Sequence, residues 1–352
     1  MKDRHIKVAA DSKLLKEIYH RVEKEISMDS VSFATIISIK FAFYFLLTLL
    51  VYCSIYLVED QIGFIICFIA YGLISLLFAF NFSHDFSHHT VFKSKRLNHF
   101  GFVTIYTLVG AHAEAWKFRH INSHHYAPNV EGYDSDLKIS KLIRVVPDSE
   151  YYWFHRYQYL YAPVAYSIYS LFWIFVKDFI ILFNDTESPV KKNLGYYLSF
   201  AMQKISYISL MLVIPVAFSK QDWSVVVIAF LLMHLLQSLF LLFTFFMTHH
   251  VEETQYPKVD GKGYISTSWL MNQIKSSNDM HPFSRMANFI LGGFNNHIAH
   301  HLFPHYHHIF YPKISKLLYQ ILAENGIMPN TTSYVGGVKS HFRLLKKMSI
   351  AH

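Results

Sequence analysis

Four long apolar stretches constrain the fold of this 352-residue chain more than any other feature. They cover residues 31–58, 62–82, 196–218 and 223–248, and each is long enough for a bilayer-spanning helix, which needs about 20 mostly apolar residues. Very short linkers separate the first stretch from the second and the third from the fourth. The sequence therefore predicts an all-α integral membrane protein with four transmembrane helices in two hairpins.

The composition agrees with a membrane protein. Hydrophobic residues make up 53% of the chain and charged residues only 16%, whereas soluble domains carry about 25% charged residues. Two further apolar stretches are ambiguous. Residues 100–113 are too short to span and indicate a re-entrant or interfacial helix. Residues 164–183 are long enough, but they contain Lys177 and Asp178, so we expect them to lie in the interface, with a fifth span as the alternative.

The distribution of Lys and Arg predicts the orientation. Of the 32 such residues, 7 precede the first stretch, 12 lie between the two hairpins and 10 follow the fourth stretch. Because positive residues mark the cytoplasmic side, we expect both chain ends and the central segment to be cytoplasmic. We predict a cytoplasmic N-terminal segment at 1–30, a membrane domain at 31–320 and a cytoplasmic tail at 321–352, with an amphipathic helix at 314–323.

Three histidine clusters flank the apolar stretches, at residues 84–89, 120–125 and 297–301. Each contains two histidines four residues apart, which share one face of a helix. The predicted orientation puts all three clusters on the cytoplasmic side. Imidazole suits iron, copper, zinc and nickel, and eight or more ligands exceed the need of one ion. The clusters therefore predict a di-metal site at the cytoplasmic face of the membrane.

Other readings of the histidines remain possible at this point. Structural zinc usually takes four ligands, often including Cys, and a transporter would place its ligands in the middle of the membrane. A membrane metal-binding or transport protein is therefore a remote alternative to an enzyme, and no nucleic-acid partner is expected. His234 lies inside the fourth stretch, where a functional role and helix packing by hydrogen bonding are both open. We interpret the isolated histidines as structural or surface residues: His5, His20, His112, His155, His281 and His352.

The residues around the clusters resemble the motifs of the membrane fatty acid desaturases, in particular the bacterial acyl-lipid and linoleoyl-CoA desaturase-like group, over roughly residues 30–320. The family has three histidine motifs, called boxes, and the first of them is similar to the segment His84-Asp85-x-x-His88 of this chain. The second is similar to Trp116-x-x-x-His120-x-x-x-His124-His125, followed by Asn129, Gly132, Asp134 and Asp136. The third is similar to Gly292-Gly293-x-Asn295-x-His297-x-x-His300-His301-Leu302-Phe303-Pro304. Further matching positions are His249-x-Val251-Glu252-Glu253, Trp269, Gln273 and Asn278.

The resemblance implies a non-haem di-iron centre that uses O2 and two external electrons to introduce a double bond into a fatty acyl chain, carried as acyl-CoA, on an acyl carrier or in a lipid. It also implies that the ligands lie in a cytoplasmic helical cap that holds the di-metal site, and that the electron donor is external and of the ferredoxin or cytochrome type. Zinc could replace iron during expression, because zinc binds nitrogen ligands more tightly than Fe²⁺. A di-iron hydroxylase or acetylenase is the alternative. The implied catalytic iron ligands are His84, His88, His120, His124, His125, His249, His297, His300 and His301.

Several neighbouring residues depart from the family pattern or extend it. His297 stands where front-end members carry Gln, which leaves the position of the double bond open. We expect Asp134 and Asp136 to hydrogen-bond ligand imidazoles, with a solvated acidic turn as the alternative. We also expect a narrow apolar tunnel for the acyl chain. Basic residues near the second box either bind phosphate groups or reflect the membrane orientation: Lys117, Arg119, Lys138, Lys141 and Arg144. Additional histidines are interpreted as neighbours of the ligands or have no assigned role: His89, His250, His305, His307 and His308.

Overall fold

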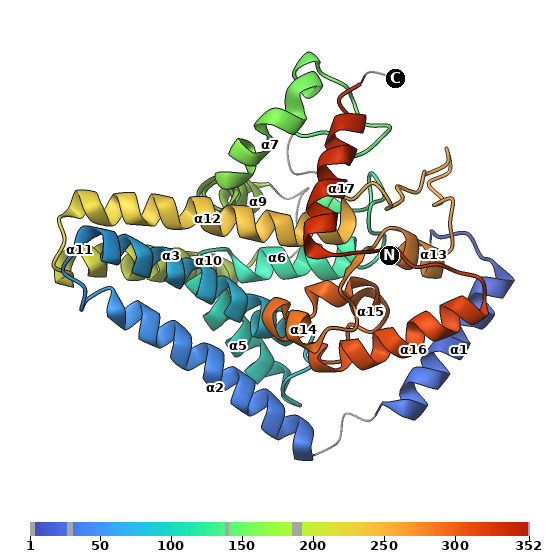
Figure 1. Ribbon diagram of the computed structural model, residues 1–352, viewed down its shortest axis with the longest axis horizontal. Coiled ribbons are helices and arrows are strands. Elements are labelled where there is room, and N and C mark those ends of the chain that lie inside the picture. Colours follow the sequence, from blue (N-terminus) through green and yellow to red (C-terminus); the bar gives the residue numbers. More distant parts are fainter. Residues whose placement is uncertain (1–3, 27–30, 138–140, 185–191, 351–352) are drawn as a thin grey trace. The chain divides into compact units, whose positions relative to one another are not determined.

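The computed structural model describes residues 4–26, 31–137, 141–184 and 192–350, and these are mostly helical (Figure 1). The chain divides into two units. The span unit comprises Ser30–Phe118 and Pro163–Leu242, and the histidine unit comprises Met1–Asp29, Arg119–Ala162 and Phe243–His352. Lys138, one of the basic residues near the second box, lies outside the described residues.

The helices of the span unit are α2 (Val31–Ser54), α3 (Gln61–Phe78), α4 (His84–Ser87), α5 (Lys95–Leu108), α8 (Tyr169–Phe172), α9 (Asp178–Phe183), α10 (Leu194–Ile208) and α11 (Ile214–Phe218). Three π-helical turns interrupt them, η1 (Ala79–Ser83), η5 (Trp173–Lys177) and η6 (Ser209–Val213). Three helices cross the boundary between the units, α6 (Ala113–Arg119), α7 (Gln158–Ser167) and α12 (Trp223–His249).

The histidine unit contains α1 (Ala9–Glu25), α13 (Trp269–Lys275), α14 (Arg285–Leu291), α15 (His297–Leu302), α16 (Tyr311–Glu324) and α17 (Tyr334–Lys347). Shorter turns are the π-helical η2 (His120–His124) and the 3₁₀ turns η3 (Ser135–Leu137), η4 (Trp153–Tyr157), η7 (Phe294–Asn296) and η8 (His308–Phe310). The strands β1 (Asp279–Met280) and β2 (Thr331–Thr332) pair in parallel.

Four helices are long and apolar enough to cross a membrane, which confirms the four predicted spans. They are Phe33–Ser54, Gln61–Ser87, Leu194–Phe218 and Trp223–His249. The first ends before residue 58, and the Asp60 side chain caps the second by accepting from the Gly63 N–H at 2.7 Å. The second span continues through a π-helical turn into α4, so one continuous helix leads into the first histidine cluster.

The segment at 153–183 is a pair of helices bent by 63°, a geometry that fits either a broken span or a re-entrant loop. Its charged residue Asp178 is buried and accepts from the ammonium of Lys204 at 2.6 Å. Lys204 also donates to the Gly110 carbonyl at 2.8 Å. Two charged residues that lie inside apolar segments, Asp178 and Lys204, are therefore partners of each other. The interfacial position expected for residues 164–183 stays a prediction.

The core of the histidine unit forms between α1, α13, α15 and α16, where Figure 1 shows α16 beside α1. Ile18, Ile274, Ile298 and Leu318 lie in this core and are fully buried. The amphipathic helix predicted at 314–323 is confirmed as part of α16. The sequence interpretation missed α17, whose buried residues Gly337, Ser340, His341, Leu344 and Leu345 recur at helical spacing.

Candidate metal centre

Seven of the nine predicted ligands lie in the histidine unit, on three segments. His249 is the last residue of α12, and α15 carries His297, His300 and His301. The remaining three belong to the π-helical turn η2 and the residue after it: His120, His124 and His125. Six of these seven side chains are buried, and His125 is half-buried.

The π-helical turn changes the expected arrangement of the second cluster. On an α-helix, His120 and His124 would share a face, and His125 would point away toward another ion. In the π-helical turn, residues five apart are linked instead, and the His125 N–H donates to the His120 carbonyl at 3.0 Å. The Nε2 atoms of His120 and His125 consequently lie 3.1 Å apart. On an α-helix His125 would point about 100° away from His124, whereas here its ring lies beside that of His120.

Three imidazole nitrogens converge at the end of α12. The Nε2 atoms of His249 and His297 lie 2.6 Å apart, and His301 Nε2 lies 3.2 Å from each of them. His124 joins the group, since the four residues offer ring nitrogens within 4.8 Å of one another. Such an approach is unfavourable for imidazoles alone unless protons or a cation lie between the nitrogens.

Hydrogen bonds to the Nδ1 atoms of these rings show that Nε2 is the nitrogen available to bind a metal. The Nδ1 atom of His249 lies 2.8 Å from the Ser276 carbonyl, and that of His301 lies 2.8 Å from Gln273 Oε1. His124 Nδ1 lies 3.1 Å from Asp134 Oδ2. These oxygens only accept, so each Nδ1 carries the proton and each Nε2 presents a lone pair. The same pattern orients metal-bound histidines in many proteins.

The donor set fits a borderline metal ion. Adjacent nitrogens on an ion with bonds of about 2.0–2.1 Å lie about 3 Å apart, close to the observed spacing of 2.6–3.2 Å. Burial holds the pKa of His301 well below its ordinary value, and the neighbouring imidazoles lower it further. The ring therefore stays neutral and keeps its lone pair for a metal.

Asp134 fixes His124 in the same way, as the sequence predicted. Burial alone would raise the pKa of Asp134, but His124 and the backbone N–H groups of Asn129 and Asp136 outweigh burial and lower it to about 2. In turn, burial would lower the pKa of His124, and the charge and hydrogen bond of Asp134 reverse this and raise it. Asp136 lies farther away, 4.0 Å from His124 Nδ1, and pairs with Arg119 at 3.1 Å.

Asn129 links the segment after the second cluster to the end of α12. It has a left-handed backbone with φ of 60°, which Asn tolerates better than most residues. Its side-chain amide donates to the carbonyls of His249 at 2.9 Å and Gln255 at 3.2 Å. A family-matching residue outside the histidine clusters therefore determines where the His249 backbone lies.

The third cluster is held by a residue that the sequence reasoning missed. Asp279 is fully buried, accepts from the Ile298 N–H at 2.9 Å and from the Tyr319 hydroxyl at 3.0 Å, and so caps the start of α15. Its position directly after the family-matching Asn278 was the available signal. Gly293, with φ of 89°, begins the preceding turn, where a Cβ atom would come within 2.6 Å of His308. His308 is thus part of the packing around α15.

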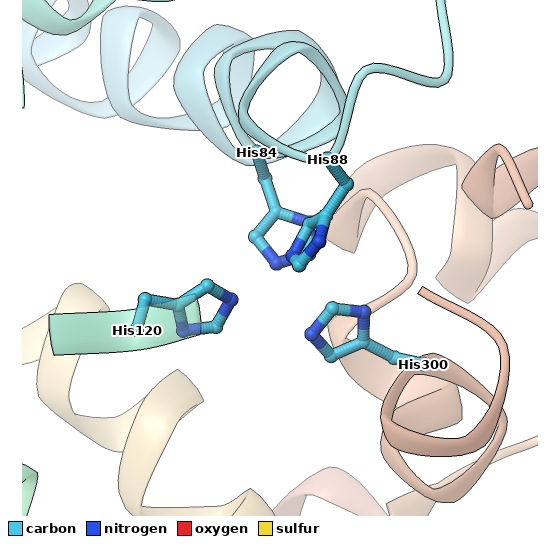
Figure 2. Close-up of side chains that lie close together, drawn as sticks. All are labelled: His84, His88, His120 and His300. Carbon is cyan, nitrogen blue, oxygen red and sulfur yellow. The ribbon is translucent and has the colours of Figure 1, made fainter. Parts of the chain in front are cut away.

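Two further histidine pairs are seen in Figure 2. In the span unit, His84 and His88 extend from the end of the second span with ring centroids 4.9 Å apart. In the histidine unit, the rings of His120 and His300 stack 5.6 Å apart at an angle of 7°. The Tyr311 hydroxyl lies 3.3 Å from His300 Nδ1. Within each unit, therefore, predicted ligands from different turns or segments are brought side by side.

The additional histidines have other surroundings. His89 is exposed, and its Nε2 lies 3.2 Å from Lys117 Nζ. His250 Nδ1 lies 2.9 Å from the Tyr256 hydroxyl, and burial lowers the pKa of His250 to about 3. In the span unit, both ring nitrogens of His234 lie 2.8 Å from hydroxyls, of Ser170 and Tyr207. These hydrogen bonds favour the helix-packing alternative for His234.

Two of the basic residues near the second box are buried and bound to backbone carbonyls. Arg119 donates to Ser135 O at 2.6 Å, and Arg144 donates to Met348 O at 3.0 Å. These contacts disfavour the phosphate-binding alternative for Arg119 and Arg144. Lys141 is exposed and donates to the Tyr152 hydroxyl at 2.8 Å.

Comparison with known proteins is consistent with this geometry. The family model described as fatty acid desaturase matches residues 62–333. The chain belongs to the fatty acid desaturase family. The family assignment makes the protein an oxidoreductase. Together with the family, the four apolar helices indicate a multi-pass membrane protein.

Named relatives include desaturases from bacteria, plants and amoebae. The chain is 30% identical over 278 residues to an sn-1 linoleoyl-lipid 6-desaturase of Arthrospira platensis, covering 77% of this chain and 74% of the relative. It is 29% identical over 276 residues to an acyl-lipid (8-3)-desaturase of Physcomitrium patens, covering 76% and 56%. It is 25% identical over 367 residues to Delta(5) fatty acid desaturase A of Dictyostelium discoideum, covering 98% and 76%.

Proposed function

We propose that this protein is an O2-dependent di-iron desaturase that introduces a double bond into the acyl chain of a membrane lipid. The observation that carries the proposal is the convergence of the Nε2 atoms of His249, His297 and His301. The opposite ring nitrogens of His249 and His301 donate to oxygens. The reaction removes two hydrogens from adjacent methylenes and, with O2, two external electrons and two protons, yields a double bond and two waters.

The proposed ligands of one ion are the four histidines with converging nitrogens, His124, His249, His297 and His301. The second ion takes His120, His125 and His300, and the family motif adds His84 and His88 to the ligand set. Iron, when bound, supplies the oxidising power needed to break an unactivated C–H bond. The protein's own task is to orient these rings through their Nδ1 partners and to keep the ligands buried from water.

An apolar cavity in the span unit supports the proposed substrate. It has a volume of about 130 Å³ and lies between the first two spans and Leu210, with Phe45, Leu49, Tyr71 and Phe78 in its lining. Phe78 precedes His84 by six residues on one helix, which corresponds to a rise of about 9 Å. We assign this cavity to methylenes of the acyl chain, in the place of the narrow tunnel expected from the sequence.

The names of the relatives support the proposed class of substrate. The relatives' names include linoleoyl-lipid and acyl-lipid desaturases, so we propose a lipid-bound acyl chain as substrate. The electron donor is a separate redox protein of ferredoxin or cytochrome type. The distribution of Lys and Arg supports an active site on the cytoplasmic face.

Lipid analysis of an expressing host tests the proposal. Expression should produce lipids lighter by two mass units than their precursors, and a His297→Ala variant should not produce them. Purified protein should contain about two metal ions per chain and should turn over with iron but not with zinc. A product heavier by one oxygen would support the hydroxylase alternative, and loss of two further hydrogens from an existing double bond would support the acetylenase. Full metal content with no lipid change would contradict the proposed activity.

A further inference from the structure

Helix α17 begins at Tyr334, just beyond the last residue of the family match, and packs along the end of α12 within the histidine unit. We propose that α17 is a clasp that positions His249 for metal binding, with Ser340 and His341 as its positioning residues. This inference rests on the proposed function, because it takes His249 as a metal ligand. Figure 1 shows α17 near the C-terminal end of the chain.

Two consecutive residues of α17 hold the turn that follows His249. His341 Nδ1 donates to the His250 carbonyl at 2.6 Å, and the Glu252 N–H donates to Ser340 Oγ at 2.9 Å. The Ser340 hydroxyl in turn donates to the Glu253 carboxylate. The last carbonyls of a helix lack partners within the helix, so these bonds satisfy backbone groups where α12 ends. Ser340 and His341 are both fully buried.

Side-chain packing adds to the hydrogen bonds. The rings of Phe246 and His341 lie 5.2 Å apart, and those of Phe243 and Phe342 lie 6.1 Å apart. A Cβ atom on Gly337 would lie 3.3 Å from the side chain of Met247, so this glycine permits a close approach of the two helices. Residues of α17 therefore pack against Phe243, Phe246 and Met247 near the end of α12.

The far end of α17 is itself anchored. Gln158 donates to the Leu345 carbonyl at 2.9 Å, and Arg144 donates to the Met348 carbonyl at 3.0 Å. Because its C-terminal end is held by these hydrogen bonds, α17 keeps Ser340 and His341 in place and does not move with the turn at 250–253. Two of the bonds that fix the clasp thus come from the segment at residues 141–158.

The consequence for His249 follows from how its backbone is held. Its carbonyl accepts from Asn129 at 2.9 Å and from Thr254 Oγ1 at 2.7 Å, and its ring donates to Ser276. Thr254 belongs to the turn to which α17 is hydrogen-bonded. Loss of the α17 contacts should therefore also weaken the hydrogen bond from Thr254 to the His249 carbonyl. Partners that orient a metal ligand typically change metal affinity by about 10–100-fold, and α17 acts on the backbone of such a ligand.

A double variant, Ser340→Ala with His341→Phe, removes all three of these hydrogen bonds and keeps side-chain volume close to the original. His341→Asn leaves Ser340 in place and keeps a donor near the Nδ1 position, so this variant should behave almost like the unchanged protein. Lys339→Ala and Lys346→Ala are matched controls, because both side chains are exposed on the same helix. All variants are prepared as the full chain in detergent.

Hydrogen exchange of the metal-stripped protein is the first measurement. In the double variant, amides at residues 246–254 should exchange about tenfold faster or more, whereas the rest of the chain and both lysine controls should match the unchanged protein. Metal analysis is the second measurement. The double variant should retain about one ion per chain instead of two, with His341→Asn close to two.

The outcomes separate this inference from the proposed function. If His249→Ala keeps both ions, the ligand assignment fails. If His249→Ala loses an ion but the double variant keeps unchanged exchange at 246–254 and both ions, the clasp is wrong and the ligand assignment stands. Faster exchange at these residues with one ion lost supports the clasp, and rescue by His341→Asn ties the effect to the donor.

Discussion

Helix α12 carries two buried histidines in very different surroundings, His234 in the apolar span and His249 at its end. Both ring nitrogens of His234 are paired with hydroxyls, of Ser170 and Tyr207. Only Nδ1 of His249 is paired with an oxygen, and its Nε2 faces two other imidazoles. Burial is the same in both places, so the partners of the second nitrogen distinguish a packing histidine from a candidate ligand.

The difference extends to the regions around the two residues. In the span unit, polar side chains satisfy one another, as in the buried pair of Lys204 and Asp178. In the histidine unit, the Nδ1 atoms of His124, His249 and His301 are hydrogen-bonded to oxygens. Ring nitrogens of these residues and His297 lie within 4.8 Å of one another. Satisfied polar groups stabilise helix packing, whereas convergent ring nitrogens need protons or a cation between them.

The strongest test exchanges each histidine separately. His249→Ala should lower desaturation by more than about 100-fold and remove about one metal ion per chain, because it deletes a proposed ligand. His234→Phe is the matched control and should keep metal and activity, with a loss of about 1–3 kcal/mol in the free energy of unfolding. Metal analysis, lipid mass spectrometry and thermal unfolding measure these effects. Loss of metal in His234→Phe with both ions kept in His249→Ala would reverse the comparison.

A second test removes the charge behind one ligand while keeping its shape. Asp134→Asn should weaken metal binding or activity by about 10–100-fold, because His124 loses the carboxylate that orients its ring. Competition with a chelator measures the affinity. Asp136→Asn serves as the control, since Asp136 pairs with Arg119 and lies farther from His124. Equal effects of the two substitutions would argue for general electrostatics rather than orientation.

A third test concerns the polar groups of the span unit. Burial would raise the pKa of Glu114, but hydrogen bonds from His112, Ser199 and Gln203 outweigh it and lower the pKa to about 2. A depressed carboxyl pKa stabilises the fold above the unfolded value near 4.5, and this contribution is lost as pH falls toward 2. Glu114→Gln should therefore cost up to roughly 3 kcal/mol at pH 7, with the difference shrinking below pH 4.

Unfolding of both proteins in detergent across this pH range measures that difference. A gap between Glu114→Gln and the unchanged protein that is constant from pH 7 to pH 3 would show that the ionised form is not favoured by folding. Metal content should stay unchanged at pH 7, which separates this polar network from the metal centre.

The smallest effect is expected at His89, a histidine of the first cluster whose Nε2 lies beside Lys117 rather than beside another imidazole. His89 is exposed, with a left-handed backbone at φ of 61°, beside Lys117. His89→Asn keeps a residue that tolerates this backbone and should leave activity within about twofold and metal content unchanged. A loss of metal comparable with that in His249→Ala would make His89 a ligand and would overturn its separation from the others.

Much of the architecture was readable from the sequence because apolar length alone specifies a span in lipid. Polar partners inside the apolar segments were not readable, since Lys204 and Asp178 meet only after folding. The helix α17 was missed because its basic residues concealed a buried face at Gly337, Ser340, His341 and Leu344. The π-helical turn at His120 was missed because spacing by four assumes an α-helix.

By itself, the sequence determined the chemical types and the approximate places of the functional groups: four apolar spans, three histidine clusters, His249 and Asp134. Tertiary structure decided which ring nitrogen is available in His124, His249 and His301. That choice depends on acceptors supplied from distant positions, such as Ser276 for His249 and Gln273 for His301. A pattern of residues fixes the ligand type, but only packing brings an acceptor to one edge of a ring and leaves the other edge for a metal.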